Sequence, residues 1–163
     1  MSQIQKLRDS GKRMEFDTGA VRDMYVGKGR CDLMPLDILA KILMDDNLLE
    51  LDQFMQTGDR AFILSALHRF AMQVWGCEET MFLETSVHFE DGAAKYGLRN
   101  WEKGIVCSSY VNSAIRHYLK FKRGDDDERH DRAFCWNLMC LYWTLEHKPE
   151  MNDLPFERKK ETA

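Results

Sequence analysis

The fold class of this chain is decided by the run AFILSALHRFAMQVW (residues 61–75). Helix-forming residues fill the run, Asp59 precedes it as a candidate N-cap, and Gly76 ends it. Because the run is apolar on most of its sides, we expect it to form a central helix. We expect His68 within it to be a core or boundary histidine rather than a ligand.

Other helices are predicted on both sides of this run, because glycine and proline residues separate segments of helical period. They are expected at residues 36–44, 78–96, 108–122 and 128–147, with a short one within 45–58. No segment of five or more residues alternates as a half-buried strand does. We therefore predict an all-α fold, a bundle of four to five helices with an irregular N-terminal arm. The expected division is an arm (1–24), a single α-helical domain (25–155) and a tail (156–163).

Composition places the chain among globular proteins and excludes several functional classes. Its 163 residues, 44% hydrophobic and 31% charged, suffice for one domain with a sizeable core. No apolar run approaches the ~20 residues that cross a bilayer, so we expect a cytoplasmic protein. A net charge of -4 argues against a nucleic-acid-binding surface but not against a nucleotide ligand. Five cysteines without CxxC spacing predict buried thiols rather than disulfides or a zinc site.

The segment HFEDGAAKYGLRNWEKG (residues 88–104) has the mixed composition of an acidic site at a helix end. It combines carboxylates with a histidine, lysines, aromatic rings and three glycines. On the predicted helix, a stripe of four polar residues forms at 100° per residue, and Glu90 points away from it. The stripe consists of Glu84, His88, Asp91 and Lys95. The alternative is two simple i,i+4 pairs on a solvated face.

Two other segments carry cations suited to an anionic ligand. The loop Gly27–Arg30 places two cations between glycines, whose backbone N–H groups can face a phosphate. On the predicted helix 108–122, Asn112 and Arg116 share a stripe, with His117 beside them. Arginine can grip phosphate oxygens in a fork, and histidine can relay a proton. A flexible turn and a solvated basic face are the alternatives.

Asn137 is a lone amide within an otherwise apolar run, where it is costly to bury without partners. It follows His130 by seven residues and therefore shares its helix face, which leads back to the acidic turn at 125–128. This pattern indicates a polar stripe that ends in a site. The alternative is a single structural hydrogen-bonding amide.

Two metal-binding schemes can be written from these residues. In the first, an ExxD pair and one carboxylate of the preceding helix hold Mg²⁺, which favours carboxylate oxygens. The residues of this scheme are Glu128 and Asp131 with Glu90 or Asp91. In the second, the adjacent His130 and Asp131 are similar to the His-Asp pair of metal phosphohydrolases. Its shell would be completed by His88 or His117 and a distant aspartate.

An ordered set of sequence blocks resembles one known family. The blocks are GKGRCDLMP (27–35), EDGAAKYG (90–97), NWEKG (100–104), SAIRH (113–117), RGDDDE (123–128), His130 and NL (137–138). Over about residues 20 to 155 they resemble the phage and bacterial dATP/dGTP diphosphohydrolase N-terminal domain family. Each block alone is unspecific, but their order is specific.

The resemblance implies an α-helical nucleotide-binding domain related to the MazG-like all-α nucleotide pyrophosphohydrolases. In those enzymes carboxylates hold Mg²⁺ (or Mn²⁺), and water attacks between the α- and β-phosphates. Together with the spacings above, it makes Glu90 and Glu128 the candidate catalytic residues. The candidate metal ligands are Glu90, Asp91, Glu128 and Asp131. The candidate substrate contacts are Lys28, Arg30, Lys95, Asn100, Trp101 (stacking on the base), Arg116, His117, His130 and Asn137.

We therefore expect a metal-dependent (deoxy)nucleoside triphosphate pyrophosphohydrolase that converts dATP or dGTP to the monophosphate and pyrophosphate. It would act in phage nucleotide metabolism, in the host cytoplasm if phage-encoded. Because the predicted helix 78–96 lacks the ExxE pattern of the MazG type, a nucleotide-sequestering phage protein without hydrolysis is the main alternative. An assembly protein with a Met-rich surface is a third. The expected partners are a nucleotide ligand and further copies of the chain, with no nucleic acid polymer and no membrane.

Overall fold

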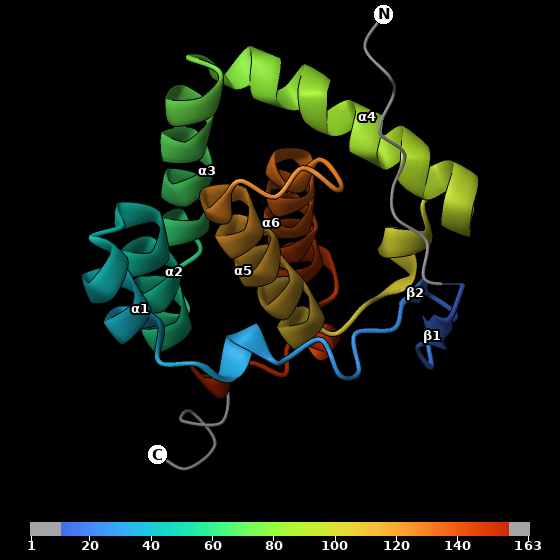
Figure 1. Ribbon diagram of the computed structural model, residues 1–163. Helices are drawn as coiled ribbons and strands as arrows, with labels where there is room; N and C mark the ends of the chain where they lie inside the picture. The colour runs from blue at the N-terminus through green and yellow to red at the C-terminus, as the bar shows by residue number, and fades with distance from the viewer. Residues whose placement is uncertain (1–10, 157–163) are drawn as a thin grey trace, which may run out of the picture.

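The structure, a computed structural model, describes residues 11–156, which contain six α-helices and one two-stranded sheet (Figure 1). The strands are β1 (Arg13–Glu15) and β2 (Val21–Asp23), and the helices are α1 (Leu36–Leu43), α2 (Asp46–Thr57), α3 (Ala61–Val74), α4 (Glu78–Tyr96), α5 (Cys107–Arg123) and α6 (His130–His147). Short 3₁₀ helices are Cys31–Leu33, Asn100–Lys103 and Pro149–Met151. The predicted all-α fold is confirmed. None of the helices in this described part is long and apolar enough to span a membrane.

Helices α5 and α6 form the centre of the fold, side by side and antiparallel across a short turn (Figure 1). Their contact buries aromatic rings, with the centroids of Tyr118 and Phe134 5.0 Å apart. Phe70 of α3 joins them, its centroid 4.7 Å from that of Phe134. Each buried ring stabilises the fold by about 1.5–3 kcal/mol. This pair of helices therefore carries the hydrophobic core.

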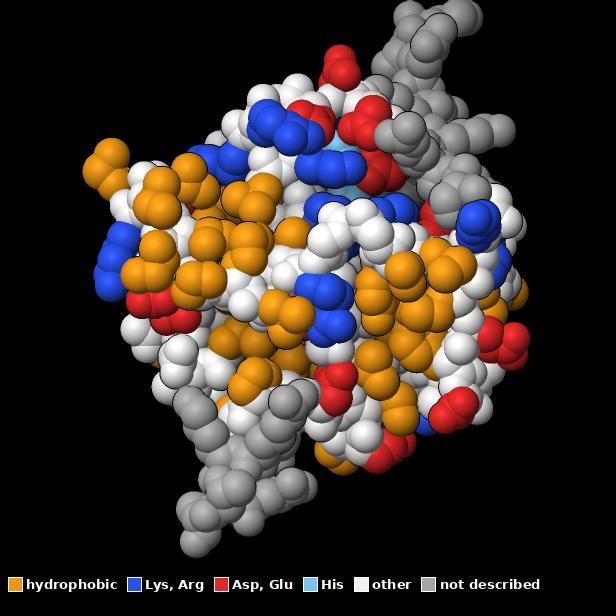
Figure 2. Space-filling view, turned by 60° about the horizontal axis from the view of Figure 1, so that its bottom comes forward, with side chains coloured by type: hydrophobic (Ala, Val, Ile, Leu, Met, Phe, Trp, Pro, Cys, Tyr) orange, Lys and Arg blue, Asp and Glu red, His pale blue; other side chains and the backbone are white. Residues whose placement is uncertain are grey.

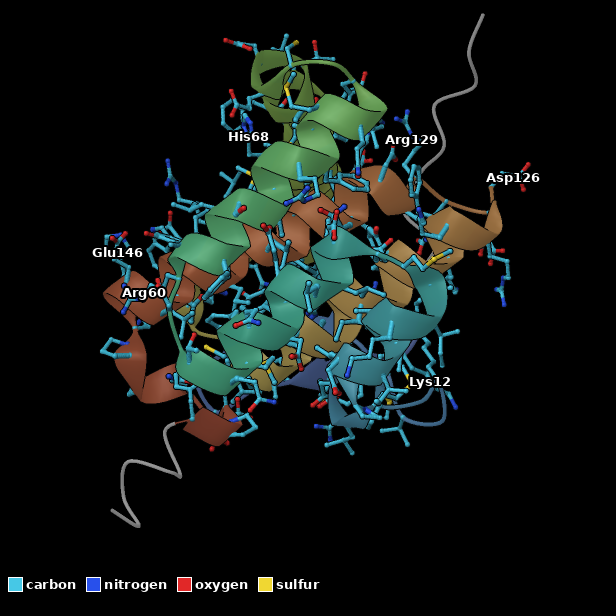
Figure 3. The ribbon with its side chains drawn as sticks, turned by 90° about the vertical axis from the view of Figure 1, so that its left-hand side faces the viewer. Lys12, Arg60, His68, Asp126, Arg129 and Glu146 are labelled. Atoms are coloured by element: carbon cyan, nitrogen blue, oxygen red, sulfur yellow. The ribbon has the colours of Figure 1, made fainter. Side chains whose placement is uncertain are left out.

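Helix α3 lies beside this pair, so the expectation that it would be central is wrong. It buries Ile63 and Phe70 on one face, whereas Leu64 and Met72 on the other are 50% and 48% exposed. His68, expected in the core or at its boundary, has a side chain that is 61% exposed and points outward (Figure 3). The segment was predicted to be central because its exposed face also carries apolar residues.

Helix α2 packs against α3, α1 packs against α2, and α4 runs from the end of α3 across to the sheet (Figure 1). The outer face of α1 is apolar and exposed, and Figure 2 shows hydrophobic side chains gathered there. Its exposed residues include Ile38, Ile42 and Leu43, followed by Met44. This face has no partner within the described chain.

The predicted irregular arm contains a β-hairpin between residues 13 and 23. Strands β1 and β2 are antiparallel, and Met14 lies opposite Arg22. The turn is closed by backbone hydrogen bonds from the Phe16 N–H to the Ala20 carbonyl and from the Gly19 N–H to the Phe16 carbonyl, and Ala20 is fully buried. Strands of three residues are too short to show an alternating pattern, which is why the sequence did not predict them. Residues 1–10 of the predicted arm lie outside the described residues.

The start of the predicted tail packs into the core. Phe156 is 7% exposed, and its ring meets that of Phe54 edge to face at 5.6 Å. Residues 157–163 of the predicted tail lie outside the described residues. Phe156 also covers Gly58, the residue that ends α2 with a φ of 73°. A Cβ atom at Gly58 would lie 2.8 Å from the Phe156 ring.

Gly58→Ala is expected to destabilise the protein by more than the matched substitution Gly124→Ala. Both glycines have positive φ, which costs an alanine about 1–2 kcal/mol. Only Gly58 adds a steric conflict, because nothing lies within 4 Å of a Cβ at Gly124. Urea denaturation of the two variants measures the difference. Equal free energies of unfolding would contradict the packing described for Phe156.

Candidate functional site: a cationic cavity

A cavity of about 670 Å³ lies between the hairpin, α4 and the α5–α6 pair. It is lined by Val21, Arg22, Asp23, Tyr25, Lys28, His88, Gly92, Lys95, Tyr96, Asn100, Ser113, Arg116, His117, Lys120, Glu128, Trp136 and Asn137. Its size suits a small-molecule ligand, for which pockets span roughly 300–1,000 Å³. The lining residues come from segments far apart in the sequence, so only the fold brings them together.

The cavity is cationic although the protein as a whole carries a net charge of -4. Five lysine and arginine side chains line it, against the two carboxylates Asp23 and Glu128. Asp23 is already engaged, because it accepts hydrogen bonds from Lys95 at 2.8 Å and from the Tyr96 hydroxyl at 3.0 Å. A concentration of like charge in a partly enclosed space favours an anionic ligand.

Arg22 of β2 is the most elaborately held of these cations. Its guanidinium donates to Ser109 Oγ and Ser113 Oγ at 3.2 Å each, and to Asn137 Oδ1 at 3.0 Å. The rings of Tyr110 and Trp136 flank it, with centroids 5.3 and 5.6 Å from its Cζ. Burial lowers the pKa of Arg22, but an arginine keeps its charge at neutral pH.

Arg116 of α5 joins the cavity to the preceding loop. It donates to Asn112 Oδ1 at 2.9 Å and to the backbone carbonyl of Gly29 at 2.5 Å. The same Asn112 oxygen accepts from the backbone N–H of Cys31 at 2.8 Å. The loop Gly27–Arg30 is therefore fixed to α5, and it places Lys28 at the edge of the cavity.

The hairpin is held in place by residues at the end of α4 and just after it. Asn100 pairs with the backbone of Val21, accepting from its N–H and donating to its carbonyl at 2.8 Å each. Lys95 and Tyr96 hold Asp23 through the bonds given above. These contacts fix the residues on either side of Arg22.

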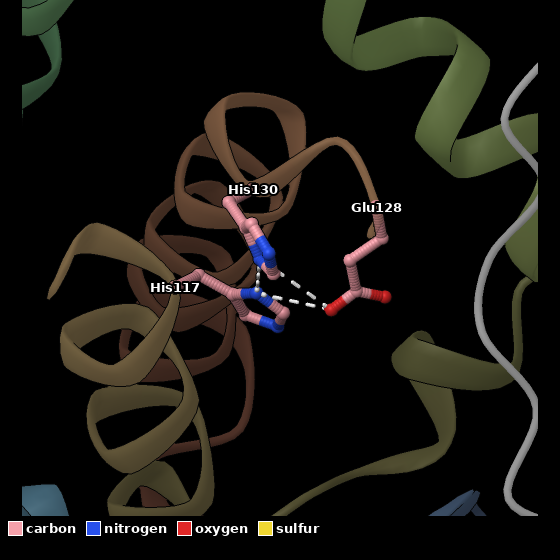
Figure 4. Close-up of side chains that lie close together, drawn as sticks. All are labelled: His117, Glu128 and His130. Atoms are coloured by element: carbon pink, nitrogen blue, oxygen red, sulfur yellow. Dashed lines mark hydrogen bonds and ion pairs between the residues drawn. The ribbon is translucent and has the colours of Figure 1, made fainter. Parts of the chain in front are cut away.

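A second group of side chains lies where α5 ends and α6 begins (Figure 4). His117 and His130 approach with their Nδ1 atoms 3.0 Å apart, and Glu128 Oε1 lies 3.4 Å from the first and 3.5 Å from the second. Asp127 accepts from His130 Nε2 at 2.7 Å, so the proton of a neutral His130 is on Nε2 and its Nδ1 carries a lone pair. Two imidazoles and a carboxylate therefore converge and can hold a divalent metal ion.

The donor set fits a transition metal better than Mg²⁺. Imidazole nitrogens suit Zn²⁺, iron or Ni²⁺, whereas Mg²⁺ prefers oxygen ligands. The bond from His130 to Asp127 is the kind of contact that orients a ligating histidine. Burial lowers the pKa of His117 well below its usual value, and His130 lowers it further. Neutral imidazoles are the protonation state that metal binding requires.

Of the predicted metal ligands, the structure brings only Glu128 to the cavity. Glu90, a candidate catalytic residue and metal ligand, is exposed and does not line it. Asp91 is half-buried and also outside the lining. Asp131 is held by Arg129 in a bidentate pair at 3.0 and 2.8 Å. Since α6 begins at His130, Glu128 precedes it, and the expected ExxD pair does not share a helical face.

The predicted substrate contacts divide into two groups. Those that line the cavity are Lys28, Lys95, Asn100, Arg116, His117 and Asn137. His130 lies behind His117, with a side chain only 1% exposed. Arg30 is instead paired with Asp32 at 2.7 Å. Trp101 packs against Phe89 and Trp143 outside the lining, so no base can stack on it from the cavity.

Sequence reasoning missed the hairpin's contribution. Arg22 and Asp23 come from the segment that was predicted to be an irregular arm, and Tyr25 and Trp136 supply aromatic surface that was not anticipated. No periodic signal marks these positions. The lone amide of Asn137 was the available clue, because its buried partner proves to be Arg22.

Comparison with protein-family models matches residues 65–154 to the family described as dATP/dGTP diphosphohydrolase, N-terminal. The matched residues are more than half of the chain. The chain belongs to this family. The resemblance seen in its sequence blocks is thereby confirmed. No curated protein and no solved structure gives a significant match.

The part shared with the diphosphohydrolase family runs from within α3 through α6 and ends at Leu154. It contains Asn100, Lys95 and Tyr96, which hold the hairpin, and the group His117, Glu128 and His130. The hairpin and the loop that carries Lys28 lie before the matched residues. The cavity of this diphosphohydrolase-family member is thus built from both parts of the chain.

Acid is expected to destabilise the protein through His88. Burial, together with the positive charges of Arg22 and Arg132, lowers its pKa from 6.5 to about 3. Between these values the unfolded chain binds a proton that the folded state does not, so the free energy of unfolding falls as the pH falls. One such group contributes up to about 1.4 kcal/mol per pH unit.

The variant His88→Phe should therefore lose less stability than the natural chain as the pH falls from 6 to 4. Phenylalanine keeps an aromatic ring against Trp136, whose centroid lies 5.5 Å from that of His88. Urea denaturation at several pH values measures both slopes. Parallel slopes would show that His88 is protonated equally in the folded and unfolded states.

Proposed function

We propose that this protein is a metal-dependent (deoxy)nucleoside triphosphate pyrophosphohydrolase acting on dATP or dGTP. The observation that carries the proposal is the cationic cavity beside the His117–Glu128–His130 group, in a member of the dATP/dGTP diphosphohydrolase family. A triphosphate supplies negative charge for the lining cations other than Lys95, which is already paired with Asp23. Because dNTP pools lie in the cytoplasm, we also propose a cytoplasmic site of action, in the host if the protein is phage-encoded.

In the proposed reaction, a water oxygen forms a bond to the α-phosphorus and the bond to the α,β-bridging oxygen breaks. The products are a deoxynucleoside monophosphate and pyrophosphate. Arg116, Lys28 and Lys120 would bind and orient the phosphates, which reduces the entropy cost of alignment. Glu128, whose Oε1 faces the two imidazoles, has a second oxygen that can accept the proton of the attacking water.

His117, Glu128 and His130 would hold the divalent ion. When bound, such an ion neutralises phosphate charge and lowers the pKa of water. Asp127 keeps His130 oriented for this role.

The activity is tested by incubating the pure protein with each dNTP and either Mn²⁺ or Mg²⁺. We expect pyrophosphate and monophosphate from dATP or dGTP. Glu128→Gln should lower kcat by about 10²–10⁴-fold, the range for a general base. The matched control Glu146→Gln should not, because Glu146 is exposed at the far end of α6 (Figure 3). Absence of product from all dNTPs would contradict the proposal.

Metal binding is tested separately by titrating Mn²⁺ and following its electron paramagnetic resonance signal. His117→Gln should weaken Mn²⁺ binding by more than the ~10–100-fold typical of losing an outer-shell partner, because a ligating imidazole is lost while the protein stays folded. The control His68→Gln removes an exposed imidazole far from the cavity. If both variants bind Mn²⁺ like the natural chain, the three residues do not form the metal site.

A second candidate function is nucleotide sequestration without hydrolysis. It is favoured by the small number of carboxylates in the cavity, where only Glu128 is not bound by a lysine. Tight binding of a dNTP that is recovered intact would support it over hydrolysis. The expected homo-oligomer stays a prediction, for which the exposed apolar face of α1 is the candidate surface.

A further inference from the structure

We propose that Arg22 of the N-terminal hairpin is a phosphate-binding residue of the cavity, which makes the hairpin part of the site. The inference rests on the proposed nucleotide ligand, but it concerns a residue that lies before the part matched to the family. It is carried by the charge, the orientation and the support of this one side chain.

Arg22 is set apart by its lack of a carboxylate partner. Seven of the ten arginines between residues 11 and 156 form an ion pair with an aspartate or glutamate. The three described arginines without one are Arg22, Arg60 and Arg116, and two of these line the cavity. The oxygens bound to Arg22 belong to two hydroxyls and an amide, all neutral. A partly buried cation without a counter-ion is unfavourable until an anion binds beside it.

The guanidinium is also held in one orientation. Of its five N–H groups, three donate to Ser109, Ser113 and Asn137, while the Nε–H and one Nη1–H donate to no described residue. Tyr110 and Trp136 restrict its position from their ring faces. A group that is already oriented loses little entropy when its ligand binds. The two free donors point from different edges of the guanidinium, because both Nη2–H groups are used, so each can donate a charged hydrogen bond to one phosphate oxygen.

The contacts that dock the hairpin fix the chain on both sides of Arg22. Asn100 binds both backbone groups of Val21, and Lys95 and Tyr96 bind Asp23, so Arg22 is supported from both neighbours in sequence. Those three supporting residues lie within the part matched to the family, whereas Arg22 does not. Residues of the family-matched part therefore hold in place a cation that lies before it in the sequence.

The surroundings select a polyphosphate rather than a singly charged acid. Arg116, Lys28 and Lys120 line the same cavity, and none of them forms an ion pair with a residue in the described part of the chain. Several cations without partners are best satisfied by several charges on one ligand. Inorganic tripolyphosphate carries this charge without a base or sugar, so it isolates the contribution of the phosphates.

The test is calorimetric titration of the full chain with tripolyphosphate, without added divalent metal. Arg22→Met should weaken binding by about 10–100-fold, as expected for loss of charged hydrogen bonds. Arg22→Lys, which keeps the charge but not the oriented N–H donors of the guanidinium, should bind with intermediate affinity. The matched control Arg60→Met should bind like the natural chain, because Arg60 donates to the Leu145 carbonyl near the end of α6, far from Asp126 and the α5–α6 turn (Figure 3). Thermal melting of each variant confirms that it is folded.

Unchanged affinity in folded Arg22→Met would overturn the inference, and so would failure of the natural chain to bind tripolyphosphate. If Arg22→Met does not fold, Arg22→Lys decides instead, and an affinity equal to that of the natural chain would overturn it. The proposed function fails differently, through binding of dNTPs without release of pyrophosphate. That result leaves the assignment of Arg22 intact.

Discussion

The packing of α5 against α6 is the constraint on which both the core and the site depend. One side of this pair buries Tyr118 and Phe134 with Phe70 of α3. The other side presents Ser113, His117 and Asn137 to the cavity. Burial of the aromatic side fixes the rotation of both helices about their axes. The polar side chains are therefore held at set positions without needing contacts of their own.

This arrangement lets the protein keep charges in a partly buried space. A buried arginine that is not paired with an acid costs several kcal/mol, and neutral hydrogen bonds from Ser109, Ser113 and Asn137 offset only part of that cost. The remainder is a free-energy gap that an anionic ligand would close. The apolar contacts between α5 and α6 supply stability that offsets the free-energy cost of this charged site.

The helices could be predicted from the sequence because helical period and terminal glycines are local signals. Glu78–Tyr96 matches its predicted range, and the other helices differ by a few residues at their ends. The rotation of α4 could not be predicted, since polar residues occur all round it, and Glu90 proved to face solvent while His88 faces the cavity. The central position expected of α3 failed for a related reason, because its exposed face is also apolar.

Only part of the candidate site could be predicted from the sequence, and the reason is physical. Arg116 and His117 could be predicted as site residues from their chemical type and helical spacing. Arg22 becomes a site residue only because the hairpin docks on Asn100, a contact across 79 positions of sequence. Trp101 illustrates the converse, since its chemistry suits a base but packing against Trp143 uses its ring. Non-local docking decides which polar groups meet, and no local pattern encodes it.

The central claim is that the cavity between the hairpin and the α5–α6 pair binds the triphosphate of a nucleotide. The most direct measurement is a crystal structure of the protein with a non-hydrolysable α,β-imido dGTP analogue and Mn²⁺. We predict that phosphate oxygens lie within hydrogen-bond distance of Arg22 and Arg116. We also predict a metal ion bound by His117, Glu128 and His130. A nucleotide bound elsewhere, or one whose phosphates point away from both arginines, would contradict it.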